Sequence, residues 1–195
     1  MVLTKLLTIA TILLFFAVDS SLQDEVIQVT VKTSACLHAG TDRNINVHFG
    51  FYDLAHDKLV STLGPLELGA GGHRLNYDSA YRFAYDLNET DIGPYHANCS
   101  QLEPIQRSRC HNSPNVVFFQ KAPRRWLDFG SDWRPEWISI TKPKYGRRTA
   151  RDQQFTTTIF KIPSGCGKSW IQGGKYAFGR WMAKIRRCKK VDRCP

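Results

Sequence analysis

The chain has 195 residues and a formal net charge of +10 at pH 7. This length is enough to bury a hydrophobic core and too short for two ordinary domains once a leader is removed, so one domain with a tail is expected. The positive charge makes the surface attractive to polyanions, and salt screens that attraction strongly.

The N-terminus has the layout of a signal peptide. One positive charge within Met1–Lys5 precedes the apolar run Leu6–Val18, and small polar residues follow at Ser20 and Ser21. The run is shorter than the roughly 20 residues of a bilayer-spanning helix. We therefore predict that residues 1–20 are removed and that the protein is secreted and extracellular; a retained signal anchor is the alternative.

All six cysteines follow this leader: Cys36, Cys99, Cys110, Cys166, Cys188 and Cys194. An even number of cysteines in an exported chain indicates disulfide bonds. The sequence leaves the connectivity open, but short loops close at little entropic cost, which favours Cys99–Cys110 and Cys188–Cys194 and leaves Cys36 with Cys166. Zinc is the competing explanation, and no two of these cysteines have the two-residue spacing of a structural zinc site.

Two N-glycosylation signals agree with export. Asn88-Glu89-Thr90 and Asn98-Cys99-Ser100 both satisfy the acceptor rule. We predict glycans on Asn88 and Asn98, the second only where Cys99 does not pair first.

Short β-branched and aromatic runs, separated by turn residues, follow along the chain. The first covers Glu25–Thr33, and the second, Asn44–Tyr52, alternates apolar with polar residues as a strand with one buried face does. Further strands are predicted at Tyr81–Leu87, Val116–Gln120, Glu136–Thr141 and Gln154–Ile162. Many short strands are typical of an all-β antiparallel sandwich or barrel, and no convincing amphipathic helix precedes the C-terminal tail.

Four segments of the sequence carry a resemblance to a known family. They are IQVTVKTSACLHAGTDRNINVHFGFYD, YRFAYDLNETDIG, NVVFFQKAPRRWLDFGSDWRPEWISI and QQFTTTIFKIPSGCGKSWI. In this order they resemble the opening two strands, the D-x-G turn, the D-W-x-x-x-W-I-x-I segment and the closing strand of PLAT domains. The resemblance covers residues 25–171, with a cysteine-containing insertion at 95–115, and it leaves a basic, cysteine-containing tail at 172–195.

The resemblance implies an antiparallel β-sandwich that is a binding module and not an enzyme. PLAT domains attached to lipases and lipoxygenases dock on membranes or partner proteins. We therefore expect a secreted, non-catalytic module that binds an anionic lipid surface or an extracellular protein or glycan, with no nucleic acid as a natural partner. The alternatives are a secreted effector or toxin-like protein and a basic secreted hydrolase or nuclease.

The turn that contains Asp42 and Asn44 is a candidate calcium site. Some PLAT domains bind calcium through this turn, and hard cations take oxygen ligands. The competing explanation is that Asp and Asn stabilise a tight turn by bonding their own backbone, and the neighbouring Arg43 would oppose a cation. No other cofactor is expected.

Aromatic and basic side chains in one predicted loop indicate a lipid contact. Trp126 and Trp133 lie close in sequence to Arg124 and Arg125, which favours contact with anionic head groups, and Arg43 is expected on a neighbouring loop. The alternative is that these large rings are half-buried under the loop itself.

The C-terminal tail has apolar residues at helical spacing: Phe178, Trp181, Met182 and Ile185. Cations fill the remaining surface, which predicts a short basic helix or tail that contacts an acidic partner through Trp181, Arg186 and Arg187. Alternatively, the apolar stripe docks on the sandwich and leaves the charges exposed. A second basic cluster, expected to be solvated, lies between two predicted strands at Lys142, Lys144, Arg147, Arg148 and Arg151.

The sequence has no recognisable catalytic motif. A nucleophile elbow, a paired-histidine metal motif and a carboxylate pair in a recognisable setting are all missing, so no catalytic residue is predicted. The six histidines are scattered. A basic nuclease would require the fold to bring two histidines and a lysine together.

Overall fold

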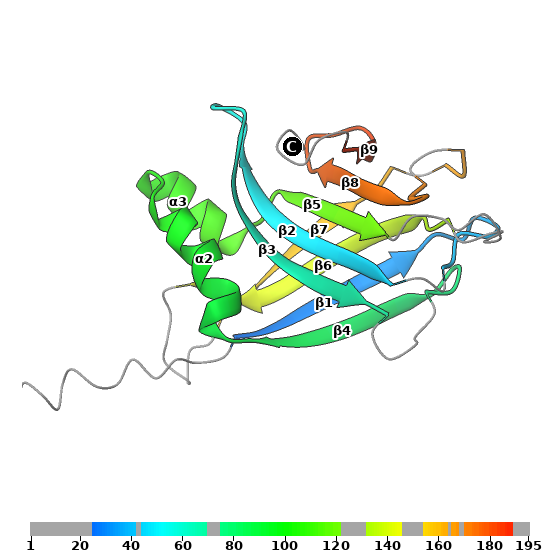
Figure 1. Ribbon diagram of the computed structural model, residues 1–195, viewed down its shortest axis with the longest axis horizontal. Coiled ribbons are helices and arrows are strands. Elements are labelled where there is room, and N and C mark those ends of the chain that lie inside the picture. The colour runs from blue at the N-terminus through cyan, green and yellow to red at the C-terminus, as the bar shows by residue number, and fades with distance from the viewer. Residues whose placement is uncertain are drawn as a thin grey trace, which may run out of the picture.

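The structure is a computed structural model that describes residues 25–41, 44–69, 75–121, 132–145, 154–163, 165–167 and 170–188. In these residues two antiparallel β-sheets face each other, and a pair of helices covers one end of the sandwich (Figure 1). The all-β antiparallel sandwich predicted from the sequence is confirmed. No helix of the described part is both long and apolar enough to cross a membrane.

The four-stranded sheet has the order β4-β1-β6-β7. Its strands are β1 (Glu25–Thr33), β4 (Ala80–Leu87), β6 (Pro135–Pro143) and β7 (Phe155–Lys161). In β1 the side chains of Ile27, Val29 and Val31 are buried while their neighbours are more exposed, because successive side chains of a strand point to opposite faces. All four strands match predicted ones to within a few residues.

The five-stranded sheet has the order β3-β2-β5-β8-β9. Its strands are β2 (Ile45–Asp53), β3 (Lys58–Leu68), β5 (Val116–Lys121), β8 (Gly174–Gly179) and β9 (Arg186–Arg187). The sequence predicted β2 and β5 and missed the other three. In β3, Gly64 and Pro65 interrupt the apolar run with residues that usually mark a turn.

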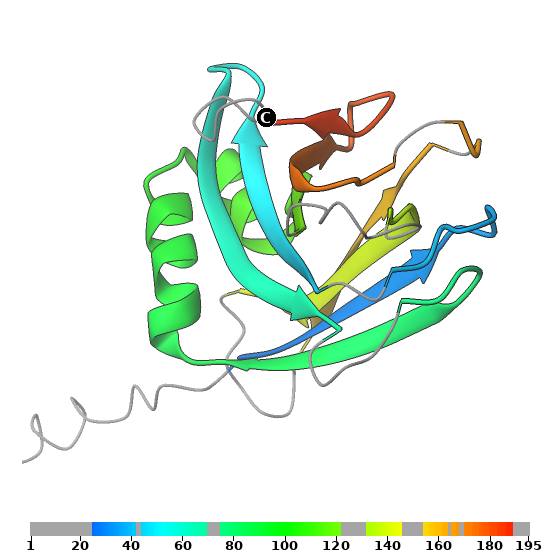
Figure 2. The same ribbon diagram turned by 45° about the vertical axis from the view of Figure 1, so that its right-hand side comes forward.

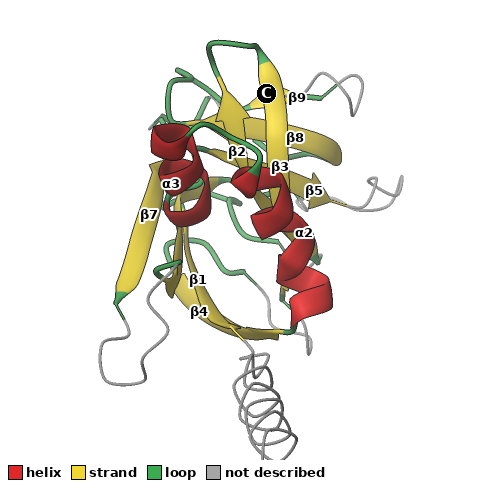
Figure 3. Ribbon diagram, turned by 90° about the vertical axis from the view of Figure 1, so that its left-hand side faces the viewer, coloured by secondary structure: helices red, strands yellow, loops and turns green. Residues whose placement is uncertain are grey.

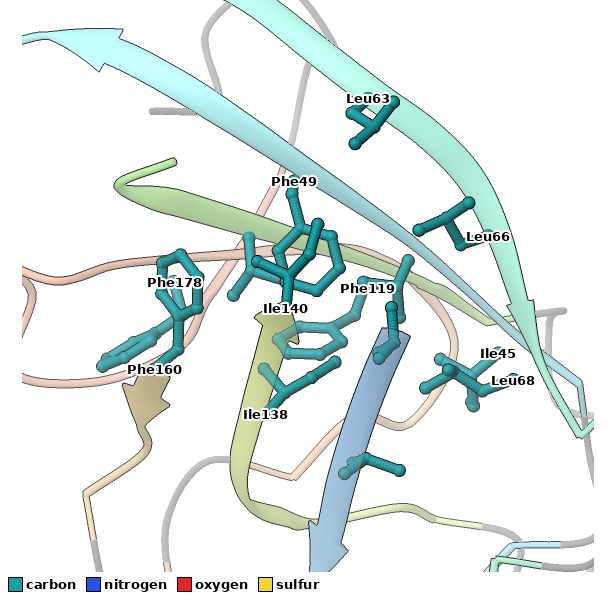
Figure 4. Close-up of a cluster of buried hydrophobic side chains, with 14 of the residues drawn as sticks. Ile45, Phe49, Leu63, Leu66, Leu68, Phe119, Ile138, Ile140, Phe160 and Phe178 are labelled. Atoms are coloured by element: carbon teal, nitrogen blue, oxygen red, sulfur yellow. The ribbon is translucent and has the colours of Figure 1, made fainter. Parts of the chain in front are cut away.

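The apolar faces of the two sheets form the core (Figure 4). The ring of Phe49 in β2 lies 5.9 Å from that of Phe160 in β7, so the contact crosses from one sheet to the other. Burying a side chain of this size contributes about 1.5–3 kcal/mol. The core therefore fixes which face of every strand is left for binding.

A helical hairpin occupies most of the stretch 95–115, where the sequence predicted an insertion and no helix. Two helices that were not predicted lie here, since α2 spans Glu89–Ser100 and α3 spans Pro104–Asn112, and neither has a convincing amphipathic pattern. Both helices cover the same end of the sandwich (Figure 3), and the loop after β1 lies at the other end (Figure 2).

The start of α2 is set by its capping residue. The side-chain oxygen of Asn88 accepts a hydrogen bond from the backbone N–H of Asp91 at 3.1 Å, and Glu89 and Asp91 place negative charge in the first turn. Both features stabilise a helix N-terminus. The helix has only a weak amphipathic pattern, so hydrophobic periodicity does not reveal it in the sequence.

Two of the predicted disulfides are confirmed. Cys99–Cys110 joins α2 to α3, and Cys36–Cys166 joins the segment after β1 to the segment after β7. Cys188 is disulfide-bonded, and its predicted partner Cys194 lies outside the described residues.

The predicted C-terminal helix is wrong. Residues Gly174–Gly179 form β8, in which Phe178 pairs with Val117 of β5. Pairing with β5 satisfies the backbone groups of this segment, and a turn then returns Met182 and Ile185 to the core. The apolar spacing that predicted a helix is therefore produced by a strand followed by a turn.

Trp133 is a core residue, which corrects the prediction that it contacts lipid. Its ring is fully buried, lies edge-on to Phe119 at 5.6 Å, and donates a hydrogen bond from Nε1 to Thr33 Oγ1 at 3.1 Å. A ring held in this way does not reach a membrane, and the burial that was kept as the alternative is the correct explanation.

We predict that Trp133→Phe destabilises the protein by about 2–4 kcal/mol, because the smaller ring leaves a void and Thr33 loses its buried partner. Urea unfolding followed by circular dichroism measures the change. Trp181→Phe, at a partly exposed position, is the control and is expected to change stability by less than about 1 kcal/mol. A Trp133→Phe variant as stable as the wild type would contradict this assignment.

Candidate functional site

The C-terminal edge of the five-stranded sheet carries a group of exposed cations. We define the β8–β9 surface as the exposed side chains of Lys175, Arg180, Trp181, Lys184, Arg186 and Arg187. The segment 174–188 that contains them has no Asp or Glu. Its five cations are therefore not neutralised from within the segment, and of the predicted contact residues it includes Trp181, Arg186 and Arg187.

The turn between β8 and β9 positions Trp181. The backbone N–H of Met182 donates to the carbonyl of Gly179 at 2.8 Å, which closes the turn. A Cβ atom at Gly179 would lie 2.7 Å from the Trp181 ring, so only glycine leaves room for the indole there. The indole lies against Tyr52 at 5.5 Å and remains 38% exposed.

An exposed apolar side chain lies on the neighbouring turn. Leu54 follows Tyr52 by two residues in the turn between β2 and β3, and it is well exposed. Leu54 was not predicted as a contact residue, because isolated apolar residues in turns are common. Trp181 and Leu54 thus provide apolar contacts beside the cations.

The end of the sandwich opposite the helices, which we call the loop end, carries the loop after β1 (Figure 2). Calcium and lipid contacts were predicted for residues of several loops. Asp42, Arg43, Arg124, Arg125 and Trp126 lie outside the described residues, so those contacts stay predictions. Asn44 is described, and its amide nitrogen donates to the Glu67 carboxylate. Among the described residues no group of three His, Cys, Asp or Glu side chains could hold a metal ion.

The loop end also exposes two large apolar side chains that were not predicted as contact residues. Leu37 is 76% exposed and Tyr77 is 60% exposed. Their loops are joined, because the backbone N–H of Asp78 donates to the carbonyl of Ser34 at 3.1 Å. The loop end is therefore a second surface, besides the β8–β9 surface, that exposes large apolar side chains.

Both predicted glycosylation sites are accessible. Asn88 and Asn98 are exposed, the first at the start of α2 and the second within it. Glycans on these residues stay a prediction, and they would lie on the helical hairpin and not on the β8–β9 surface.

A buried polar cluster joins the helical hairpin to the four-stranded sheet. The Nδ1 atoms of His96 in α2 and His111 in α3 are 2.9 Å apart, and the ring of Tyr145 stacks on that of His111 at 3.8 Å. His96 Nε2 lies 3.4 Å from the carboxylate of Glu25 in β1. Lys142 of β6 completes the cluster, with its ammonium group 5.6 Å from the ring centroid of Tyr95.

This cluster brings two histidines and a lysine together, the combination that a nuclease would require. His111 is only 2% exposed and Lys142 only 1% exposed, and the two imidazoles touch each other. A substrate phosphate between the rings would have to separate them. The cluster is therefore closed to a substrate in this conformation.

Several polar atoms in the cluster have no hydrogen-bond partner. They are Glu25 Oε2, His96 Nε2 and Lys142 Nζ. Burial, together with the nearby charges of His96, Lys142 and Arg107, lowers the pKa of His111 to about 4, although Glu25 acts in the opposite direction. One Nδ1 of the imidazole pair must accept the hydrogen bond that the other donates, so only one of the two Nδ1 atoms carries a proton in this geometry.

We predict that acid weakens the folded state through His111. The unfolded histidine takes up a proton near pH 6.5 and the folded one only near pH 4, so stability falls as pH drops through this window, by up to about 1.4 kcal/mol per pH unit. His111→Gln should flatten this part of the profile in urea unfolding. His38→Asn, at an exposed histidine, is the control. Equal slopes for His111→Gln and the wild type would contradict the prediction.

Lys142 corrects the expectation that the second basic cluster is solvated. It lies in β6 with its side chain buried against Tyr95. Burial lowers its pKa to about 8, and Glu25 only partly offsets this. Arg147, Arg148 and Arg151 lie outside the described residues.

We predict that Lys142→Met stabilises the protein at pH 7 by about 1–3 kcal/mol, because it removes an unpaired buried charge. The wild type gains stability between pH 8 and 10.5, where only the unfolded lysine still binds a proton, and the variant should lose this gain. Thermal unfolding from pH 7 to pH 10.5 measures both effects, with Lys161→Met at an exposed position as the control. A destabilised variant would mean that Lys142 has a required partner.

Comparison with known proteins identifies similar folds and no family. No family model matches the chain, and no curated protein matches it. Solved structures similar to it include a lipoxygenase in complex with arachidonate, at 12% identity and a TM-score of 0.47, over 80% of this chain and 16% of that one. Alpha toxin from Clostridium absonum matches at 16% identity and a TM-score of 0.43, over 83% of this chain and 33% of that one.

An alpha-toxin from Clostridium perfringens is similar at 15% identity and a TM-score of 0.41, over 82% of this chain and 33% of that one. The chain thus spans a third or less of these proteins. At this level of similarity neither their activities nor their ligands extend to this chain.

Proposed function

We propose that this protein is a secreted, non-catalytic PLAT-like module that docks on anionic lipid surfaces through its β8–β9 surface. The observation that carries the proposal is the set of five exposed cations around Trp181, in a segment without any acidic residue. The apolar leader and the disulfides support secretion.

The chemistry of this surface fits a bilayer that contains anionic lipid. A lysine or arginine near such a surface contributes about 1 kcal/mol, and indole rings favour the head-group region. Trp181 supplies the indole, and Leu54 on the next turn supplies a second apolar contact. An extracellular acidic protein or glycan would also be attracted by the charges.

The absence of catalysis is part of the proposal. Of the two histidines and the lysine that would suit a basic hydrolase, His111 and Lys142 are buried, and His96 contacts His111. The loop end with Leu37 and Tyr77 is a second region for docking, and calcium bound near Asp42 and Asn44 would strengthen its hold on anionic lipid.

We predict that Arg186→Glu/Arg187→Glu lowers binding to phosphatidylserine-containing vesicles by at least roughly 30-fold, because two attractive charges become repulsive. Flotation with phosphatidylcholine vesicles, with and without phosphatidylserine, measures it. Arg82→Glu/Lys161→Glu is the matched control, since it changes the net charge equally at exposed positions of the other sheet. Wild-type binding should fall in about 1 M salt, where the screening length is about 3 Å.

Failure of the wild type to bind anionic vesicles at low salt would overturn the membrane proposal and leave an extracellular protein or glycan as the partner. Equal loss of binding in the control variant would show that only the net charge matters. Repeating flotation with calcium and with chelator tests the contribution of the loop end.

A further inference from the structure

A hollow lies on the outer face of the five-stranded sheet, next to the β8–β9 surface. Its volume is about 200 Å³. It is lined by His48 of β2, Leu59 and Thr62 of β3, Phe118, Phe119 and Gln120 of β5, Lys175 of β8, and Cys188. Lys175 belongs both to the hollow and to the β8–β9 surface.

The walls of the hollow are partly apolar, although they are on the solvent side of the sheet. His48 and Phe118 are paired across β2 and β5, and both are half-buried, as is Leu59. A period-two strand usually places polar residues on this face. Phe118 and Leu59 therefore provide an apolar surface on the solvent side of the sheet, where it does not contribute to the core.

The polar part of the hollow is basic. His48 and Lys175 both line it, and none of the lining residues is acidic. Burial first, and the charge of Lys175 second, lower the pKa of His48. A bound anion would reduce this repulsion, so the hollow is complementary to negative charge.

The size of the hollow limits what it can hold. A cavity of about 150 Å³ with apolar walls accommodates a benzene molecule, so about 200 Å³ accommodates a short aliphatic chain and not a whole phospholipid. The backbone N–H of Cys188 donates to the carbonyl of Lys175 at 2.8 Å, which holds these two walls together.

We propose that this hollow binds a fatty-acid anion, with its carboxylate between Lys175 and His48 and its chain against Leu59 and Phe118. The proposal deepens the proposed function and rests on it, because it names a single-chain anionic lipid as a ligand beside the surface that docks. The chain of a longer fatty acid would continue out of the hollow toward the bilayer.

Isothermal titration of the full secreted protein with octanoate tests the proposal. We expect octanoate to bind at least roughly tenfold more tightly than acetate, which lacks the chain, and octylammonium, which carries the wrong charge, to show no binding. Lys175→Gln should weaken octanoate binding by about 5–10-fold, whereas Arg180→Gln, at an exposed cation that does not line the hollow, should not.

Thr62→Trp supplies the steric test. Thr62 is exposed on β3, so a large ring there fills the hollow and leaves the core intact. The variant should lose octanoate binding and keep the wild-type unfolding midpoint. In NMR titration, octanoate should raise the pKa of His48 in the wild type and not in Thr62→Trp.

Two results would overturn this inference: octanoate binding no tighter than acetate, or equal octanoate binding by the wild type and Thr62→Trp. Vesicle flotation separates it from the docking proposal, because Thr62→Trp keeps every cation of the β8–β9 surface. Vesicle binding without octanoate binding would remove the hollow as a ligand site and keep the surface. Octanoate binding without vesicle binding would keep the hollow as a ligand site and remove the β8–β9 surface as a membrane-docking site.

Discussion

The contact between Phe49 and Phe160 joins the two sheets, and the positions of the exposed side chains depend on it. Because side chains alternate along a strand, fixing Phe49 toward the core turns His48 toward solvent. The same reasoning applies to β5, where Phe119 packs on Trp133 and its neighbour Phe118 faces outward. A shift of one residue in register would therefore exchange the core with the binding face.

The local sequence pattern was sufficient to predict strands with a strong β-residue pattern. It was insufficient where pairing with a distant strand decides the secondary structure. β1 was predicted from its short run of β-branched residues, and β2 from apolar residues that recur at period two. The end of the chain was mispredicted because Phe178, Met182 and Ile185 fit a helical period, although β5 provides a pairing partner that the sequence does not display. The helix α2 was missed because its signal is Asn88 and the acidic first turn, not an apolar stripe.

The candidate site was only partly predictable for a similar reason. Trp126 and Trp133 look alike in sequence, since both are large rings close to arginines, and what identifies Trp133 as a core residue is its bond to Thr33, a hundred positions earlier. Lys142 likewise reads as one cation of a basic loop, yet the register of β6 directs it under α2. Trp181, Arg186 and Arg187 were predicted to contact a partner; the structure leaves all three exposed, and the contact itself stays a prediction.

The helical hairpin protects the edge of the five-stranded sheet. β3 is an edge strand, and an exposed edge invites pairing with another chain. α2 lies against β3, and Ser61 Oγ of that strand donates to the carbonyl of Tyr95 at 3.2 Å. The hairpin meets the four-stranded sheet through the cluster of His96, His111 and Lys142. Buried polar atoms without a hydrogen-bond partner in this cluster weaken the packing of the hairpin on the sheet. Leu59 and Thr62 of the same strand line the basic hollow, so the helices that cover β3 also hold one wall of the candidate ligand site in place.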